Sequence, residues 1–189
     1  EITCYGADIR GHRESFEGYV LKGLLEESLG SAMTPGDASR IAKEHEITVK
    51  HRDPDPRRVD GNSIEVTYIS QTGERHTVVG RVNNGEAEIT QVGEYRTAIP
   101  TSPLELVVVQ YQDRPGVADE IGSILTKNGY NKIDGTIRRQ KGGANAMTFF
   151  SVIPNSHIQK RVAELVKDNI RSIPGVHNAV YVDLREISS

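Results

Sequence analysis

A polar turn between an apolar strand and a helix is the part of this chain best suited to binding a small ligand. Asp113 stands in that turn, Pro115-Gly116-Val117 opens the helix, and Asn131 follows the far end of the same helix. Gly116 lets a ligand approach the backbone, and the free N–H groups and positive dipole end of a helix can hold a carboxylate. Asp113 can take an ammonium group, while the Asn131 amide both donates and accepts. The pattern predicts a site for a small zwitterion such as an amino acid.

The same residues also have an ordinary structural interpretation. Pro115 suits the first turn of a helix, where its missing N–H is not needed. Asp113 is a common residue type for a helix cap or turn, and Asn131 for the turn after a helix. Spacing alone leaves both interpretations open.

Residue patterns for catalysis or metal binding do not occur in the sequence. The single cysteine, Cys4, cannot form a thiolate cluster, and no two histidines flank a glutamate at helical spacing. Neither GxGxxG nor GxxxxGK[ST] occurs, and no serine stands in a GxSxG setting. We therefore expect a sensor without catalytic residues, metal or bound cofactor. The six histidines are His12, His45, His51, His76, His157 and His177.

Composition narrows the class of protein further. Of the 189 residues, 36 % are hydrophobic and 26 % charged, with a net charge of −3, which is typical of a globular protein with no basic stripe for nucleic acid. No apolar run reaches the roughly 20 residues that a membrane helix needs. The lone cysteine favours a reducing, cytoplasmic environment. Because the chain starts at Glu1 without a signal peptide, we expect it to be a piece of a longer protein.

Hydrophobic periodicity predicts two domains, residues 1–103 and 104–189, in an α+β arrangement. The first domain combines a short strand at 2–6, helices over 14–30 and 34–44, an exposed loop over 51–62, and a β-meander from Ser63 to Ile99 with period-two alternation. Pro100-Thr101-Ser102-Pro103 interrupts both patterns and indicates a linker.

The second domain has the order strand, helix, strand, strand, helix, strand. Its β-branched and alternating segments surround two helical stripes, and this is the ferredoxin-like βαββαβ order. We expect four antiparallel strands with two helices on one face.

At this point the residues resemble a known family. Tyr111-Gln112-Asp113-Arg114-Pro115-Gly116-Val117, with Ile121–Leu125 and Gly129-Tyr130-Asn131, resembles the ACT domain that ends D-3-phosphoglycerate dehydrogenase. Segments 20–26 and 37–44 are similar to the intervening, or allosteric substrate-binding, domain of the long bacterial form of that enzyme. The resemblance covers essentially the whole chain.

The resemblance implies a role. That family is an NAD-dependent oxidoreductase that opens the phosphorylated route to serine, and serine inhibits it by binding between ACT domains of neighbouring subunits. Carried over to this chain, the serine contacts are Tyr111, Asp113 and Asn131. The site then needs a homo-oligomer of at least two chains. NAD and the catalytic residues belong to domains that this chain lacks, so the chain alone is not expected to turn over substrate.

The resemblance also implies a second, anion-binding pocket in the intervening domain. One position that we align with a lysine is Glu88 here, which leaves Lys22, Arg81 and Arg96 as weak substitutes. Tyr130 and Lys132 replace smaller or apolar residues around Asn131. Two alternatives stay open: a regulatory part of an iron–sulfur L-serine dehydratase, and an oligomerisation module that binds no ligand.

Overall fold

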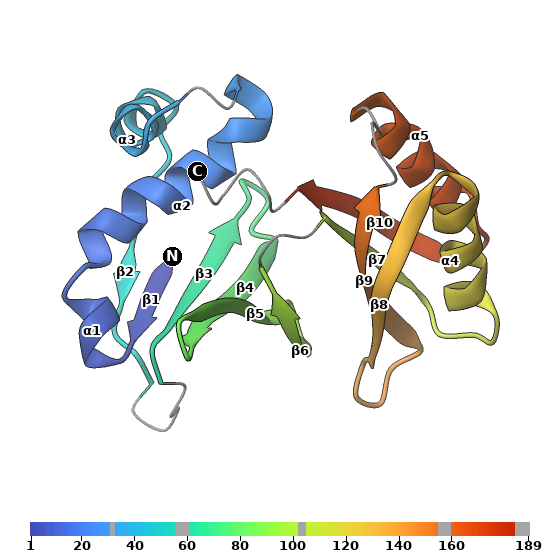
Figure 1. Ribbon diagram of the computed structural model, residues 1–189. Coiled ribbons are helices and arrows are strands. Elements are labelled where there is room, and N and C mark those ends of the chain that lie inside the picture. Colours follow the sequence, from blue (N-terminus) through green and yellow to red (C-terminus); the bar gives the residue numbers. More distant parts are fainter. Residues whose placement is uncertain (31–32, 56–60, 102–104, 155–159, 184–189) are drawn as a thin grey trace. The chain divides into compact units, whose positions relative to one another are not determined.

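The computed structural model describes residues 1–30, 33–55, 61–101, 105–154 and 160–183. They form two β-sheets with helices (Figure 1), which confirms the expected α+β class. The chain divides into two compact units, the first ending at Gly93 and the second beginning at Glu94. The sequence places the domain boundary between 103 and 104, and the linker residues 102 and 103 lie outside the described part.

The first sheet has six strands in the order β2-β1-β3-β4-β5-β6. Strands β3, β4 and β5 form the expected antiparallel meander, with Val66 opposite Val78 and Val78 opposite Val92. Gly73 and Gly85, at φ of 85° and 84°, occupy turn conformations that disfavour other residue types. The bounds are β1 Ile2–Tyr5, β2 His51–Arg52, β3 Ser63–Ile69, β4 Arg75–Asn83, β5 Glu86–Val92 and β6 Tyr95–Pro100.

Two longer helices bury an apolar stripe in the first unit. Leu21 and Leu25 of α2 pack on two buried alanines of α3. Thr34 caps α3 because its Oγ1 accepts from the Asp37 N–H at 3.2 Å, while the Asp37 carboxylate accepts from the Thr34 N–H at 3.2 Å. The bounds are α1 Ala7–Arg10, α2 Arg13–Leu29 and α3 Pro35–Glu44.

Two short elements differ from the sequence expectation. The helix α1 is a single turn, too short to show a hydrophobic period. The strand β2 lies at the start of the segment expected to be an exposed loop, and it pairs in parallel with Ile2-Thr3 of β1. Residues 56–60 of that segment lie outside the described residues. A strand of two residues is recognised only by its pairing with another strand, because two residues are too few to show the alternation that predicts a strand.

Two arginines, Arg52 of β2 and Arg75 of β4, donate hydrogen bonds to the Glu1 carboxylate and lower its pKa. Arg52 Nε donates to its carboxylate at 3.0 Å and Arg75 Nη2 at 2.7 Å. The hydrogen bond from Arg52, followed by that from Arg75, lowers the pKa of Glu1 from 4.5 to about 2. Because the folded pKa is the lower one, this contribution to stability is present above pH 4.5 and is lost as pH falls towards 2.

We expect an NMR titration of the Glu1 side-chain carboxyl carbon to give a pKa of about 2 in the native chain. In Arg52→Gln the pKa should move back towards 4.5, because the largest cause of the shift is removed. Arg40→Gln should leave the pKa of Glu1 at about 2, because Arg40 forms an ion pair with Glu44 and not with Glu1. A Glu1 pKa near 4.5 in the native chain would contradict the hydrogen bonds from Arg52 and Arg75.

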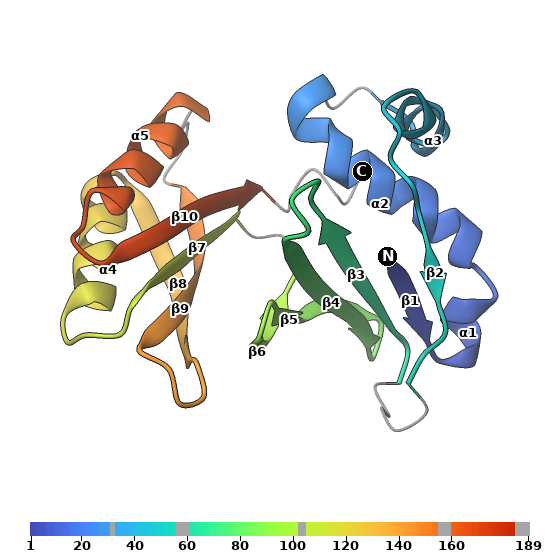
Figure 2. The ribbon, with the colours of Figure 1, turned by 180° about the vertical axis from the view of Figure 1, so that it is seen from behind.

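The second sheet has four strands in the order β10-β7-β9-β8, and all of its described pairings are antiparallel. Helices α4 and α5 lie on the same side of it (Figures 1 and 2). This confirms the expected ferredoxin-like order. The bounds are β7 Glu105–Gln112, α4 Val117–Lys127, β8 Tyr130–Arg139, β9 Asn145–Pro154, α5 Lys160–Arg171 and β10 Val176–Asp183.

The core of the second unit lies between this sheet and its two helices. Alternate residues of β7 face the helices, and β9 contributes its even-numbered residues to the same face. The α4 stripe supplies Val117, Ile121 and Leu125, each 1 % exposed or less. This packing fixes α4 and the turn before it relative to the ends of β7, β8 and β9. The core consists of Val107, Val109, Tyr111, Val117, Ile121, Leu125, Tyr130, Ala146, Phe150, Val152, Val166, Ile170, Ile173 and Ala179.

Candidate functional site

Asp113 lies in the turn between β7 and α4 and is fixed from two sides. Its backbone N–H donates to the Ala144 carbonyl at 2.7 Å, which extends the pairing of β7 with β9 by one residue. Its carboxylate accepts from Arg139 Nε at 2.6 Å, and 27 % of the Asp113 side chain is exposed. The carboxylate is therefore ordered and accessible, and it already forms an ion pair with Arg139.

The helix α4 begins two residues later than the sequence suggests, at Val117 instead of Pro115. Its first helical residue is Val117, and Gly116 is the N-cap, with φ of 89° in the left-handed region. Pro115 therefore precedes the cap rather than occupying the first turn, which corrects the sequence expectation. No described heavy atom beyond the neighbouring residues comes within 4 Å of the position that a Gly116 Cβ would take. The backbone here is open to a ligand, as expected for a glycine.

Two of the expected site residues point into the core. Tyr111 is 2 % exposed, and its hydroxyl lies 2.8 Å from the Thr148 hydroxyl. Val117 is 1 % exposed and belongs to the apolar stripe of α4. In this arrangement each can offer a ligand its backbone only. Tyr111 supports the site by tying β7 to β9 directly beneath the turn.

Asn131 lies at the opposite end of the sheet from Asp113. It is exposed near the start of β8, where it pairs with Ile153, whereas Arg139 at the end of β8 pairs with Ala146. Eight residues of strand at about 3.3 Å each separate Asn131 from Arg139, or roughly 26 Å. One copy of the chain therefore does not bring Asp113 and Asn131 together.

Two arginines that the sequence reasoning did not select take part in this region. Arg139 binds Asp113, as described above, and Arg114 donates to the Pro174 carbonyl. The available signal for Arg139 is its position just before Lys141-Gly142-Gly143, a glycine-rich segment typical of a turn between two strands. In an antiparallel arrangement that turn lies at the same end of the sheet as the β7–α4 turn.

Comparison with known proteins assigns part of the chain to a family. Residues 106–169 match the ACT domain family. The matched segment, which lies in the second unit, is an ACT domain. It is also similar to D-3-phosphoglycerate dehydrogenase of Synechocystis sp., with 31 % identity over 107 residues, 56 % of this chain and 19 % of that enzyme. The resemblance read from the sequence is thereby confirmed, while the chain spans only about a fifth of the length of that relative.

The solved structures to which this chain is similar are distant in sequence. The ACT domain of GTP pyrophosphokinase from Chlorobium tepidum is 13 % identical, covering 42 % of this chain and 96 % of that one, with a TM-score of 0.35. A homoserine dehydrogenase from Thiobacillus denitrificans is 12 % identical, covering 82 % and 46 %, with a TM-score of 0.32.

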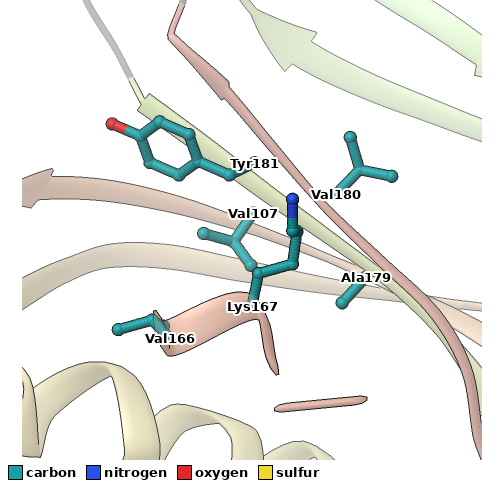
Figure 3. A pocket seen from close by; sticks show the side chains of 6 residues that line it. All are labelled: Val107, Val166, Lys167, Ala179, Val180 and Tyr181. Carbon is teal, nitrogen blue, oxygen red and sulfur yellow. The ribbon is translucent and has the colours of Figure 1, made fainter. Parts of the chain in front are cut away.

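A small cavity in the ACT domain lies away from the Asp113 turn and is too small for an amino acid. It measures about 10 Å³, room for one water molecule. Figure 3 shows Lys167 of α5 beside Val107, Val180 and Tyr181, which lie towards the other end of β7 and β10. Burial, and then a hydrogen bond to the buried Glu105, raises the pKa of Tyr181. This end of the ACT domain is packed core with a buried polar contact.

The residues suggested for an anion pocket of the first domain lie on three different elements. Lys22 lies on α2, Arg81 on β4 and Arg96 on β6. Arg81 forms an ion pair with Glu88, its cross-strand neighbour, so the acidic residue at the position aligned with a lysine pairs with Arg81. Arg96 is exposed, and its carbonyl accepts from Arg138 Nε at 2.8 Å. The anion pocket itself stays a prediction.

Among the described residues, no three His, Cys, Asp or Glu side chains come together in a way that could hold a metal ion. None of the helices there is both long and apolar enough to cross a membrane.

Proposed function

We propose that this chain is the regulatory part of a cytoplasmic D-3-phosphoglycerate dehydrogenase, and that paired ACT domains bind L-serine and thereby inhibit the enzyme. NAD and the 3-phosphoglycerate substrate would bind domains other than the two described. The proposal rests on the ACT family match and on the similarity to the Synechocystis enzyme. The observation that best supports an amino-acid ligand is the accessible carboxylate of Asp113 beside the open backbone at Gly116.

The positions of Asp113 and Asn131 favour a site shared by two chains. The strand β8 lies at one edge of the ACT sheet and carries Asn131 near one end and Arg139 at the other. Antiparallel pairing of β8 with its copy across a two-fold axis near the middle of the strand would set Asn131 of one chain beside Arg139 and Asp113 of the other. Two equivalent sites would form, each with a residue from both chains.

Calorimetry with L-serine, glycine and D-serine tests the proposed ligand, alongside sedimentation velocity with and without L-serine. We expect L-serine to release heat, to bind more tightly than the other two, and to favour the dimer. Allosteric couplings of about 1–3 kcal/mol are typical, so a modest ligand-linked change in assembly is sufficient. No heat with serine at millimolar concentration, together with unchanged sedimentation, would identify an oligomerisation module without this ligand.

The shared site makes a further prediction for mixed dimers. Asp113→Ala and Asn131→Ala should each lose tight serine binding as homodimers, because every site lacks one contact. A dimer with one chain of each kind has one intact site and one doubly altered site. After dissociation and random reassociation of an equal mixture, about half of the dimers hold one chain of each kind. The mixture should therefore recover wild-type affinity at about a quarter of the wild-type stoichiometry. No restoration on mixing would contradict a site formed by both chains.

A further inference from the structure

The carboxylate proposed to bind the ligand ammonium is already paired with a cation of the same chain. Arg139 Nε lies 2.6 Å from Asp113 Oδ2, within charge-assisted hydrogen-bond distance. The Asp113 backbone is anchored to Ala144, so the carboxylate is held at the end of the sheet while the arginine reaches it from the end of β8. An incoming ammonium therefore meets a carboxylate whose charge is already paired at Oδ2, and it competes with Arg139 for that charge.

We infer that Arg139 is an internal competitor for the amino group of the ligand, and that it leaves Asp113 when the ligand binds. This inference rests on the proposed function, since it concerns the same carboxylate. It makes Arg139 a residue that sets ligand affinity without contacting the bound ligand. It also requires the ligand to carry a positive charge, because a neutral amide cannot replace a guanidinium on Asp113.

The surroundings of Arg139 allow this exchange. Its side chain is 66 % exposed, and it ends β8 immediately before the β8–β9 turn, so its long stem can swing into solvent. Exposed ion pairs are weak, and the loss of this one should change the ligand Kd by only about two- to fivefold. The competitor therefore tunes the affinity and does not block the site.

The test measures L-serine binding by calorimetry to wild type, Arg139→Gln, Arg139→Lys and Lys141→Gln. Arg139→Gln should bind serine about two- to fivefold more tightly, because Asp113 no longer has to exchange one cation for another. Arg139→Lys keeps a cation in reach and should stay close to wild type. Lys141→Gln removes an exposed charge two residues away, in the β8–β9 turn, and controls for the general loss of positive charge. N-acetyl-L-serine, which lacks the ammonium group, should bind none of the four proteins.

The outcomes separate this inference from the proposed function. Wild-type binding of serine with an equal or higher Kd in Arg139→Gln would overturn the competitor role while leaving the serine site in place. Equal tightening in Lys141→Gln would also overturn it, because the effect would then be general electrostatics. No binding in wild type and Arg139→Gln alike would overturn the proposed function and the inference with it. Binding detectable only in Arg139→Gln supports both.

Discussion

Replacing Asp113 by asparagine should raise the Kd for L-serine by about 10- to 150-fold. A hydrogen bond to a charged group contributes about 1.5–3 kcal/mol, and each 1.4 kcal/mol corresponds to a factor of ten. The asparagine keeps the shape of the side chain but presents a neutral amide to the ligand ammonium. The backbone contact from Asp113 to Ala144 does not involve the side chain, so the turn itself should be retained.

Calorimetry on the intact chain measures this change, with Asp168→Asn as the control. Asp168 is an exposed carboxylate on α5, and its replacement removes the same charge from the same ACT domain at a position outside the β7–α4 turn. Thermal unfolding of Asp113→Asn should stay close to wild type, because the lost ion pair with Arg139 is exposed and worth about 1 kcal/mol or less. Equal serine affinity in Asp113→Asn and wild type would remove Asp113 from the site.

Much of the fold follows from short-range patterns in the sequence. Period-two alternation over Ile64, Val66 and Tyr68, with glycine turns between the runs, predicts the meander, and the structure has it. The βαββαβ order follows in the same way from alternating and helical stripes. These patterns predict the elements correctly because each element buries one face. The apolar residues of that face therefore recur at a fixed spacing over a short stretch of sequence.

The elements that the sequence did not predict depend on partners distant in the chain. The parallel pairing of β2 with β1 joins residues about fifty positions apart, and two residues carry no period. The ion pair of Asp113 with Arg139 spans 26 positions and depends on the register of β7, β9 and β8 together. No local pattern predicts which of the nearby arginines reaches the carboxylate.

The burial of Tyr111 also depends on packing that the sequence does not show. Val107, Val109 and Tyr111 stand at alternate positions of β7, and alternate side chains of a strand share a face. Leu106 and Val108 make the opposite face equally apolar, so the alternation does not tell which face meets the helices. The family resemblance suggests a ligand contact for Tyr111, whereas the structure buries its side chain and places its hydroxyl 2.8 Å from that of Thr148.

Replacing Phe150 by alanine should lower the free energy of unfolding of the ACT domain by about 3–5 kcal/mol. Phe150 is 2 % exposed on the central strand β9, and it packs on the helix face with the core of α4 and α5. Removing a buried aromatic ring loses its transfer free energy and leaves a cavity, because the sheet and two helices around it cannot close fully. The loss is a large part of the stability of a single domain.

Because the chain forms two compact units, the measurement must report on the second one. Hydrogen exchange of the β7 and β9 amides, followed in urea, gives the unfolding free energy of that unit directly. Ile153→Ala is the matched control on the same strand, since Ile153 is 50 % exposed, and it should cost about 1 kcal/mol or less. In Phe150→Ala, α4 would lose its packing surface, so serine binding at the Asp113 turn should fall in proportion to the unfolded fraction. Unchanged exchange of the β9 amides in Phe150→Ala would show that the core between this sheet and α4 does not hold the turn in place.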